Sequence, residues 1–249
     1  GLILGAVCYG AAGICDRQYE QLDALMSSDA AAVVSKSATM EPVHRDMHGR
    51  VRWSDTDHVY NCVGLGNEGL EYYCRYQSRF DDMSLSRVND MLSAQDKPYI
   101  ISIYPCDEYT LREQLLMLEK YAIAHCEINI SCGNVGREIP VGANAETLET
   151  YLRICARFRA RREADNSLSI GLKMPPELWR GRLDPIAKIL ATNRDSFDYL
   201  VCTNSIPGTY IPGMAETSCS VSGGDIMRAV SLSNVRYWTE RGFRVVGCG

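Results

Sequence analysis

The sequence predicts an α/β protein folded as a (β/α)8 TIM barrel. Along its 249 residues, short segments rich in Val, Ile and Leu alternate with segments of helical period. This alternation is typical of parallel strands joined by crossover helices. No glycine-rich dinucleotide turn follows the first strand, which argues against an open doubly wound sheet. Polar residues also stand at the carboxyl ends of several predicted strands, where the active sites of barrels form.

The elements can be read in chain order. The predicted strands are 31–35, 99–103, 126–130, 167–173, 199–203 and 244–247. The predicted helices, several of them opened by an Asp or Asn cap, are 16–26, 68–79, 107–122, 144–162, 183–194 and 226–241. Residues 40–60 are polar and show no periodicity, so we expect a long loop there. His44 and His48 in this loop lack an accompanying carboxylate pattern, and we expect no metal site.

Composition limits the class of protein. With 46% hydrophobic and 23% charged residues, the chain suits one globular domain over residues 1–249. A net charge of −5 without a basic stripe argues against nucleic acid as a partner, and no apolar run has the roughly 18 residues of a membrane span. The 11 cysteines are scattered and lack zinc-site spacing, which favours a reducing compartment, either the cytoplasm or an organelle matrix. Because the chain starts at Gly1 and stops at Gly249, just after a predicted strand, we expect a barrel truncated at both ends.

One predicted strand runs directly into a candidate active-site loop. Ile128 and Ile130 alternate with polar Asn129 and Ser131, as in a strand with two different faces. Cys132 follows, beside a glycine and between two asparagines, where we expect an exposed thiol. Such a cysteine is a candidate base or nucleophile. Taken alone, the stretch fits an ordinary reduced loop cysteine equally well.

Other strand ends and turns carry residues suited to binding. Lys36, Lys173 and Asn204 each follow or end a predicted strand, and a barrel would bring such ends to one face. Glycine-rich turns lie at 61–69, at 222–225 and at the end of the chain. Paired glycine-rich turns in the last loops of a barrel bind phosphate through backbone amides. The sequence therefore predicts a phosphorylated cofactor or substrate.

Several motifs carry a family resemblance. They are 11–14 (Ala-Ala-Gly-Ile), 35–39 (Ser-Lys-Ser-Ala-Thr), 61–69 with two following tyrosines, 129–135 (Asn-Ile-Ser-Cys-Gly-Asn-Val), 171–176 (Gly-Leu-Lys-Met-Pro-Pro), 204–206 (Asn-Ser-Ile), 223–224 (Gly-Gly), 232–235 (Leu-Ser-Asn-Val) and 247–249 (Gly-Cys-Gly). Together they resemble the class 1A, soluble dihydroorotate dehydrogenases, which are FMN-containing (β/α)8 barrels of pyrimidine biosynthesis. The resemblance extends over nearly the whole chain.

The resemblance implies the oxidation of (S)-dihydroorotate to orotate, with FMN as cofactor, Cys132 as catalytic base and fumarate as electron acceptor, in a homodimer. Because a free thiol titrates at about 8.5, activity should rise with pH until the thiolate forms. By resemblance, the substrate-binding residues are Lys36, Asn61, Val63, Gly64, Leu65, Asn129, Asn134, Asn204 and Ser205. The FMN-binding residues are Ala11, Ala12, Gly13, Lys36, Ser37, Asn129, Lys173, Gly223, Gly224, Cys248 and Gly249.

The chain departs from the family in ways that leave other functions open. Gly66 and Gly133 stand where the family has loop prolines, and each exchange loosens its loop by roughly 0.4–1 kcal/mol. Residues 207–222 form a shorter segment than in the family, and the closing βα unit expected after Gly249 is missing from this sequence. One alternative is a related flavin barrel that acts on another pyrimidine. The other is a catalytically inactive barrel that serves as a structural or assembly subunit.

Overall fold

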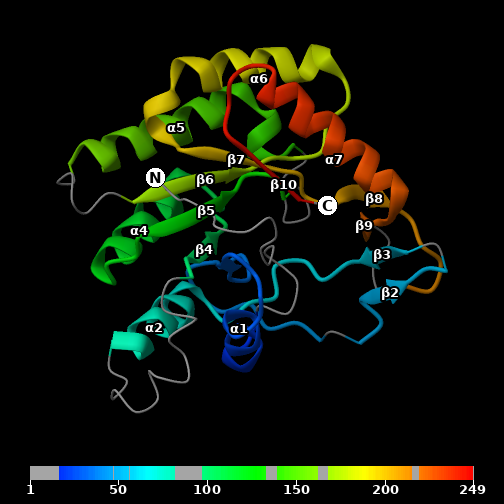
Figure 1. Ribbon diagram of the computed structural model, residues 1–249, viewed down its shortest axis with the longest axis horizontal. Helices are drawn as coiled ribbons and strands as arrows, with labels where there is room; N and C mark the ends of the chain where they lie inside the picture. The colour runs from blue at the N-terminus through cyan, green and yellow to red at the C-terminus, as the bar shows by residue number, and fades with distance from the viewer. Residues whose placement is uncertain are drawn as a thin grey trace. The chain divides into compact units, whose positions relative to one another are not determined.

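The computed structural model describes residues 17–46, 48–55, 57–81, 97–132, 139–161, 168–214 and 219–248 (Figure 1). The chain divides into two compact units. The first unit comprises residues 1–44, 67–128 and 157–170, and the second unit comprises residues 45–66, 129–156 and 171–249.

Six parallel strands form the main sheet, in the order β1-β4-β5-β6-β7-β10. They are β1 (Val33–Val34), β4 (Tyr99–Ile103), β5 (His125–Asn129), β6 (Ser169–Lys173), β7 (Tyr199–Cys202) and β10 (Val245–Gly247). The described pairs β1/β4, β4/β5, β6/β7 and β7/β10 are all parallel. Parallel neighbours need a crossover connection, which the helices between them provide. Each strand predicted from the sequence is therefore confirmed, with boundaries that shift by at most two residues.

The helices also follow the prediction. They are α1 (Tyr19–Met26), α2 (Leu70–Asp81), α4 (Glu108–Lys120), α5 (Ala145–Ala160), α6 (Arg180–Thr192) and α7 (Gly224–Thr239), with short 3-10 helices η1 (Val141–Ala143) and η3 (Arg194–Ser196). Helix α6 starts three residues before its predicted start at Leu183. The reason is that the carbonyl of Trp179 already accepts hydrogen bonds from the N–H groups of Arg182 and Leu183, at 3.0 and 3.2 Å.

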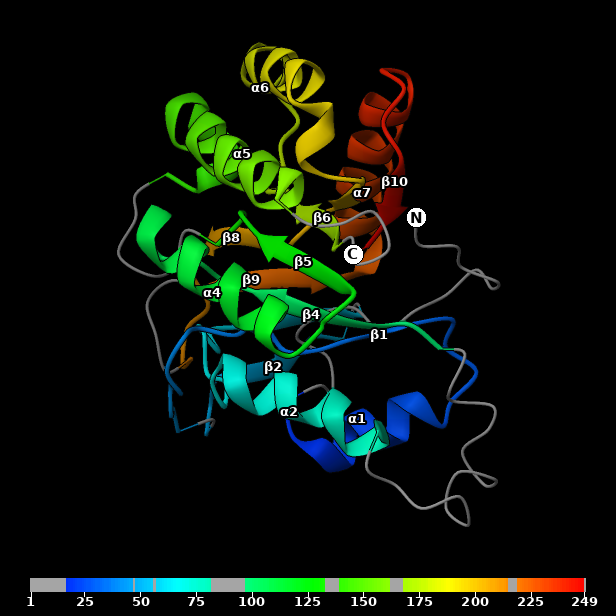
Figure 2. The ribbon, with the colours of Figure 1, turned by 90° about the vertical axis from the view of Figure 1, so that its left-hand side faces the viewer.

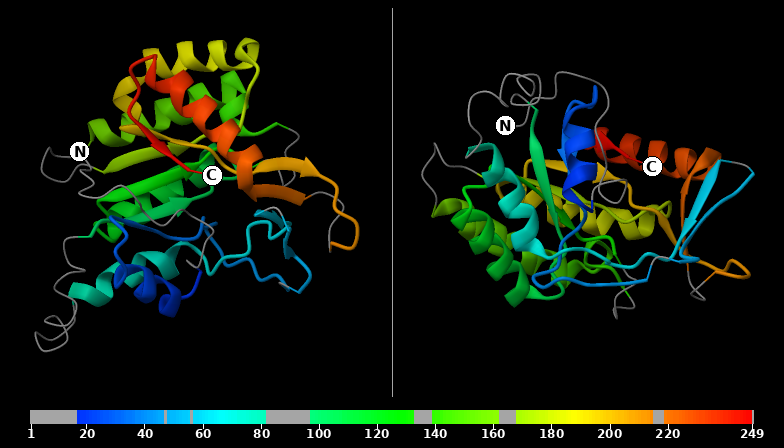
Figure 3. Two further views of the ribbon diagram at one scale, coloured as in Figure 1. Left: turned by 45° about the vertical axis from the view of Figure 1, so that its right-hand side comes forward. Right: turned by 90° about the horizontal axis from the view of Figure 1, so that it is seen from below.

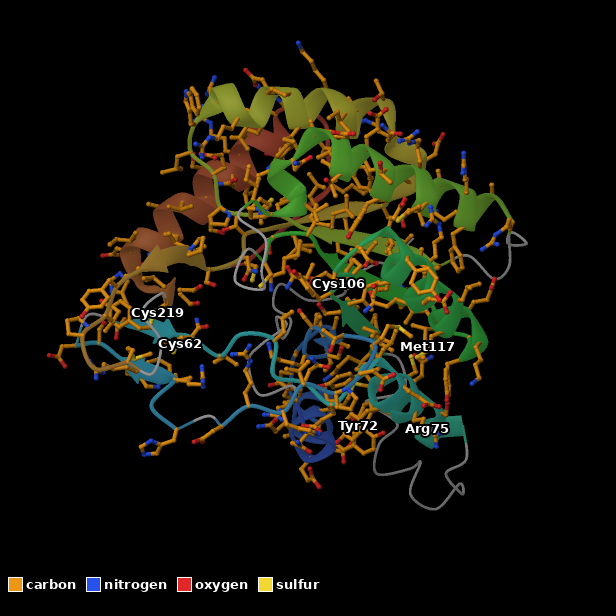
Figure 4. All side chains as sticks on the ribbon, turned by 180° about the vertical axis from the view of Figure 1, so that it is seen from behind. Cys62, Tyr72, Arg75, Cys106, Met117 and Cys219 are labelled. Atoms are coloured by element: carbon orange, nitrogen blue, oxygen red, sulfur yellow. The ribbon has the colours of Figure 1, made fainter. Side chains whose placement is uncertain are left out.

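Apolar stripes on the helices build the core of the first unit. Helix α4 buries Leu111, Leu115 and Leu118 completely, as its helical spacing predicts. Helices α1 and α2 lie side by side (Figure 2), and the rings of Tyr19 and Tyr72 stack with centroids 4.0 Å apart. Figure 4 shows Tyr72 on α2. These contacts fix the helices that cover this unit's part of the parallel sheet.

The second unit contains a small antiparallel sheet that the sequence analysis missed. Its strands, in the order β2-β3-β9-β8, are β2 (Val51–Trp53), β3 (His58–Asn61), β9 (Cys219–Gly223) and β8 (Ile206–Thr209) (Figure 3). The expectation of an irregular loop over 40–60 is therefore wrong for this hairpin. All of β2 is exposed, and its Val-Arg-Trp alternation is only three residues long, which is too short to mark a strand in the sequence. The other neighbour of β3, which is β9, is distant in the chain, although the pairing of Asn61 with Ser220 brings Cys62 and Cys219, labelled in Figure 4, to the same part of this sheet.

No helix among the residues that the structure describes is both long enough and apolar enough to cross a bilayer. The longest of the described helices, α5 and α7, have 16 residues each, and a bilayer core requires roughly 20.

Candidate active site

In the second unit, backbone hydrogen bonds hold the carboxyl ends of three parallel strands together. After β6, the N–H of Met174 donates to the carbonyl of Val201 at 2.9 Å, and the carbonyl of Met174 accepts from the N–H of Asn204 at 3.1 Å. After β7, the N–H of Thr203 donates to the carbonyl of Cys248 at 2.7 Å. The residues that follow β6, β7 and β10 are thus fixed relative to one another. Side chains placed on them form a preorganised set.

A chain of hydrogen bonds connects the end of β5 with the end of β7. The hydroxyl of Ser131 donates to Oδ1 of Asn129 at 2.6 Å and accepts from Nδ2 of Asn204 at 2.5 Å. Oδ1 of Asn129 also accepts from the backbone N–H of Ser131 at 3.2 Å, and Oδ1 of Asn204 accepts from the N–H of Ser205 at 2.9 Å. Because both amide oxygens have donors, both amides have a defined orientation. Asn129 and Ser131 are buried, so this orientation is shielded from water.

Cys132 follows the residue at the centre of this chain. Its thiol is half-buried, whereas the sequence analysis expected it to be exposed. The strand before it is held in place, because the N–H of Gly142 donates to the carbonyl of Ile130 at 2.8 Å. A Cβ on Gly142 would lie 2.7 Å from a ring carbon of Pro175, so η1 packs closely here. The backbone on the amino side of Cys132 is therefore rigidly supported, which suits a group that must meet a substrate in one geometry.

A buried lysine ends β6. Lys173 is only 4% exposed, and a buried ammonium group is costly unless polar groups or an anion surround it. Gly171 and Lys173 share one face of the strand, because alternate residues of a strand point the same way. The ring of Tyr199 occupies the space beside Gly171, where an added Cβ would come within 2.4 Å of it. An aromatic side chain thus lies next to the lysine on this face.

Two glycines open helix α7. Gly223 and Gly224 both have positive φ, at +69° and +66°. A Cβ on Gly223 would lie 2.9 Å from the carbonyl oxygen of Asp57, and one on Gly224 would lie 2.6 Å from the ring of His58. Glycine is required at both positions, and the N-cap has no side chain to satisfy the first amides of the helix. Such a helix start is suited to an anion.

A second cysteine near the strand ends is chemically different from Cys132. Cys202 is fully buried at the end of β7. Burial raises the pKa of its thiol, and the neighbouring Cys248 raises it further. The thiol of Cys202 therefore stays protonated, and it cannot serve as a base at neutral pH.

The predicted substrate loop of the second unit follows β3. Asn61 and Val63 are half-buried and Leu65 is buried. Gly64 has a φ of +63°, and a Cβ there would lie 3.2 Å from the guanidinium of Arg45. Arg45 was not predicted as a site residue, because nothing in a polar segment of sequence distinguishes an arginine that contacts a glycine turn.

Two predicted site residues belong to the first unit. Lys36 follows β1 and is half-buried, and the next residue, Ser37, is 3% exposed. The hydroxyls of Ser37 and Ser102 are 2.9 Å apart, and the N–H of Ala38 donates to the carbonyl of Ser102 at 2.9 Å. The segment that carries Lys36 is thus an extension of β1, held against β4.

Ala11, Ala12, Gly13, Asn134 and Gly249 lie outside the described residues. Within the described ranges, no group of three or more His, Cys, Asp or Glu side chains is arranged to hold a metal. Of the predicted residues, the structure joins Asn129, Asn204 and Ser205 through one hydrogen-bond chain. Ser131, whose hydroxyl joins them, stands inside the motif 129–135 but was not among the predicted site residues.

Comparison with known proteins identifies the family. The profile of the family "Dihydroorotate dehydrogenase" matches residues 3–249. The chain belongs to the dihydroorotate dehydrogenase family. It is 28% identical over 256 residues to "Dihydroorotate dehydrogenase (fumarate)" of Saccharomyces mikatae, covering 96% of this chain and 74% of the relative. It is 27% identical over 255 residues to "Dihydroorotate dehydrogenase A (fumarate)" of Lactococcus lactis, covering 96% of this chain and 75% of that one.

Solved structures confirm the fold class. Ligand-free DHODH from Eimeria tenella superposes with a TM-score of 0.75 at 16% identity, covering 98% of this chain and 72% of that one. The same protein in complex with ferulenol gives a TM-score of 0.73 at 16% identity, covering 98% of this chain and 70% of that one. The predicted α/β barrel is confirmed by this likeness. The family match makes the chain an oxidoreductase of the dihydroorotate dehydrogenase type, as the sequence motifs implied.

Proposed function

We propose that this chain catalyses the FMN-dependent oxidation of (S)-dihydroorotate to orotate, with Cys132 as the base and fumarate as the electron acceptor. The observation that carries the proposal is the hydrogen-bond chain from Asn204 through Ser131 to Asn129, directly before Cys132. The names of the two relatives support the substrate and the acceptor. A single flavin-binding barrel domain, a cytoplasmic location and a homodimer are further parts of this proposal.

The described residues of the second unit fit a flavin. Lys173 provides a buried cation at the end of β6, which could interact with the carbonyl groups of a polar aromatic ring. The hydroxyl of Thr203 is buried and has no hydrogen-bond partner among the described residues, so a polar atom can be accommodated there. The glycines that open α7 leave its first amides without a side-chain cap, which suits the phosphate.

In this proposal the protein positions the substrate and removes one proton. When bound, FMN supplies the acceptor for the hydride. The thiolate of Cys132 takes the proton from a ring carbon of dihydroorotate. The amides of Asn129 and Asn204 donate to carbonyl oxygens of the substrate ring, where their orientation is set before binding. By resemblance, Lys36 pairs with the substrate carboxylate.

Replacing the proposed base tests the assignment. Cys132→Ser should keep the yellow colour of bound flavin and lose turnover about 10²–10⁴-fold near neutral pH, the usual contribution of a positioned base. Cys106→Ser is the matched control, because it makes the same change at an exposed thiol just before α4. Full activity in Cys132→Ser would remove this residue from the mechanism.

Ligand binding tests the rest of the proposal. Orotate should bind tightly and perturb the flavin spectrum, and Lys36→Ala should abolish that perturbation. Tighter binding of uracil or thymine than of orotate would indicate that the chain acts on another pyrimidine. A colourless protein that takes up no added FMN would contradict both enzymatic functions and favour a structural subunit.

A further inference from the structure

The segment that carries Lys36 forms a β-bulge against β4. The N–H of Ser35 donates to the carbonyl of Ile100 at 2.9 Å, and further along the N–H of Ala38 donates to the carbonyl of Ser102 at 2.9 Å. The segment thus advances three residues, from 35 to 38, while β4 advances two, from 100 to 102. A regular parallel ladder advances equally on both strands, so the stretch around Lys36 holds one extra residue. Bulges of this kind next to active sites re-aim a side chain.

Side chains hold the bulge at both ends. On the amino side, the hydroxyl of Ser35 accepts from the N–H of Ser102 at 3.0 Å, in place of a strand carbonyl. On the carboxyl side, Nε2 of Gln114 donates to the carbonyls of Ala38 and Tyr104, at 3.1 and 3.2 Å. Gln114 comes from α4, and all these residues belong to the first unit. One amide group therefore joins the two chain segments directly past the bulge.

Stability gives little reason for a glutamine at this place in α4. Gln114 is fully buried in a stripe that is otherwise apolar, beside Leu111 and Leu115. The carbonyl of Ala38 already accepts from the N–H of Tyr104 at 2.8 Å. Oε1 of Gln114 has no hydrogen-bond partner among the residues that the structure describes, and a buried acceptor of this kind is costly. This cost offsets the gain from the bond to the carbonyl of Tyr104.

We infer that Gln114 is a positioning residue, which holds the bulge so that the ammonium group of Lys36 meets the carboxylate of a pyrimidine ligand. Lysine carries its charge on a flexible four-carbon stem, so a fixed backbone limits where the ammonium group can go. Gln114 acts through the backbone at Ala38, two residues after Lys36. The inference rests on the proposed function and adds to it a residue that favours an acidic ring over a neutral one.

The test compares Gln114→Met with Leu118→Val, in the full chain. Gln114→Met keeps the length of the side chain and removes both donors, and it should change the thermal midpoint by no more than about 4 °C. Leu118→Val is the matched control, because it trims another fully buried side chain of α4, and it should lower the thermal midpoint by about 2–4 °C. Only Gln114→Met should weaken orotate binding by the flavin-loaded protein, by about threefold to tenfold.

Two readouts separate the positioning of Lys36 from a general loosening of the protein. Uracil is the same ring without the carboxylate, so Gln114→Met should bind uracil as the wild type does. The carboxylate of dihydroorotate keeps its charge throughout the oxidation, so the loss in Gln114→Met should appear in KM, with kcat nearly unchanged. Equal losses of affinity for orotate and uracil, or a lower kcat at unchanged KM, would overturn the inference.

Hydrogen exchange in the ligand-free protein tests the two bonds of Gln114 directly. In Gln114→Met, the amides of Ala38 and Tyr104 should exchange faster, whereas that of Val33, before the bulge, should exchange as in the wild type. Unchanged exchange at Ala38 and Tyr104 would rule the inference out. If the wild type binds orotate and Gln114→Met binds it equally well, the inference fails and the proposed function stands. If the wild type binds neither FMN nor orotate, both fail.

Discussion

Ser131 is the hydroxyl on which the orientation of two predicted substrate ligands depends. Ser131→Ala removes the acceptor for Nδ2 of Asn204, at 2.5 Å, and the hydroxyl donor to Oδ1 of Asn129, at 2.6 Å. Each hydrogen bond contributes about 0.5–1.5 kcal/mol to stability. The free energy of unfolding should therefore fall by about 1–3 kcal/mol. The backbone N–H of Ser131 still reaches Asn129, which keeps the loss at this level rather than higher.

The larger effect is expected on ligand recognition. Without the hydroxyl, the amide of Asn204 keeps, among the described residues, its contact with the N–H of Ser205, and its NH2 group loses the acceptor Ser131. If orientation of this amide is worth one hydrogen bond to the ligand, orotate should bind about tenfold more weakly, which corresponds to about 1.4 kcal/mol. Cys132 is unchanged in this variant, so the pH dependence of turnover should keep its shape.

Urea unfolding and orotate titration measure the two effects separately. Ser131→Thr is the matched variant, because it retains the hydroxyl and adds one methyl group. It should recover most of the orotate affinity even if the added methyl lowers stability. Wild-type affinity for orotate in Ser131→Ala would refute the reasoning, since the amides would then be oriented without this hydroxyl.

Two further predictions concern the second unit. Gly171→Ala should destabilise the protein by about 1–3 kcal/mol in urea unfolding, because its Cβ would lie 2.4 Å from the ring of Tyr199. Gly181→Ala is the control, because its nearest neighbour is an exposed tryptophan side chain at the start of α6. This variant should be neutral or should gain up to about 1 kcal/mol of stability from the higher helix propensity of alanine. Equal losses in both would contradict the packing argument. The hydroxyl of Tyr237 donates to Asp184 at 2.5 Å and lowers the pKa of that carboxyl, so Tyr237→Phe should raise this pKa toward its ordinary value, as followed by NMR titration. The stability that the carboxylate of Asp184 adds is present above its unfolded pKa and is lost as the pH falls through the lowered folded pKa. The difference in the free energy of unfolding between wild type and Tyr237→Phe should therefore shrink in acid. A difference that stays constant down to acidic pH would refute the assignment.

The sequence by itself determined the alternation of strands and helices in the parallel part of the fold. The strand at 99–103 is buried along its length, and its apolar residues, interrupted only by Ser102, mark it clearly. Helix α4 is equally clear, because Asp107 caps it by accepting from the N–H of Thr110 at 2.7 Å and its apolar residues fall on one face. The motif around Cys132 is one of several that together carried the family resemblance, and it could be read from the sequence because its residues are adjacent in the chain.

Only the tertiary structure decided the features that depend on segments distant in sequence. The pairing of β3 with β9 joins Asn61 to Ser220, and neither exposed β2 nor half-buried β3 has a buried face that alternates with an exposed one. The role of Ser131 depends on Asn204, and Thr203 could be recognised as a hydroxyl without a partner only once its surroundings were known. A hydrogen bond depends on the positions of two groups in space, whereas a local pattern of polar and apolar residues indicates only which residues are buried.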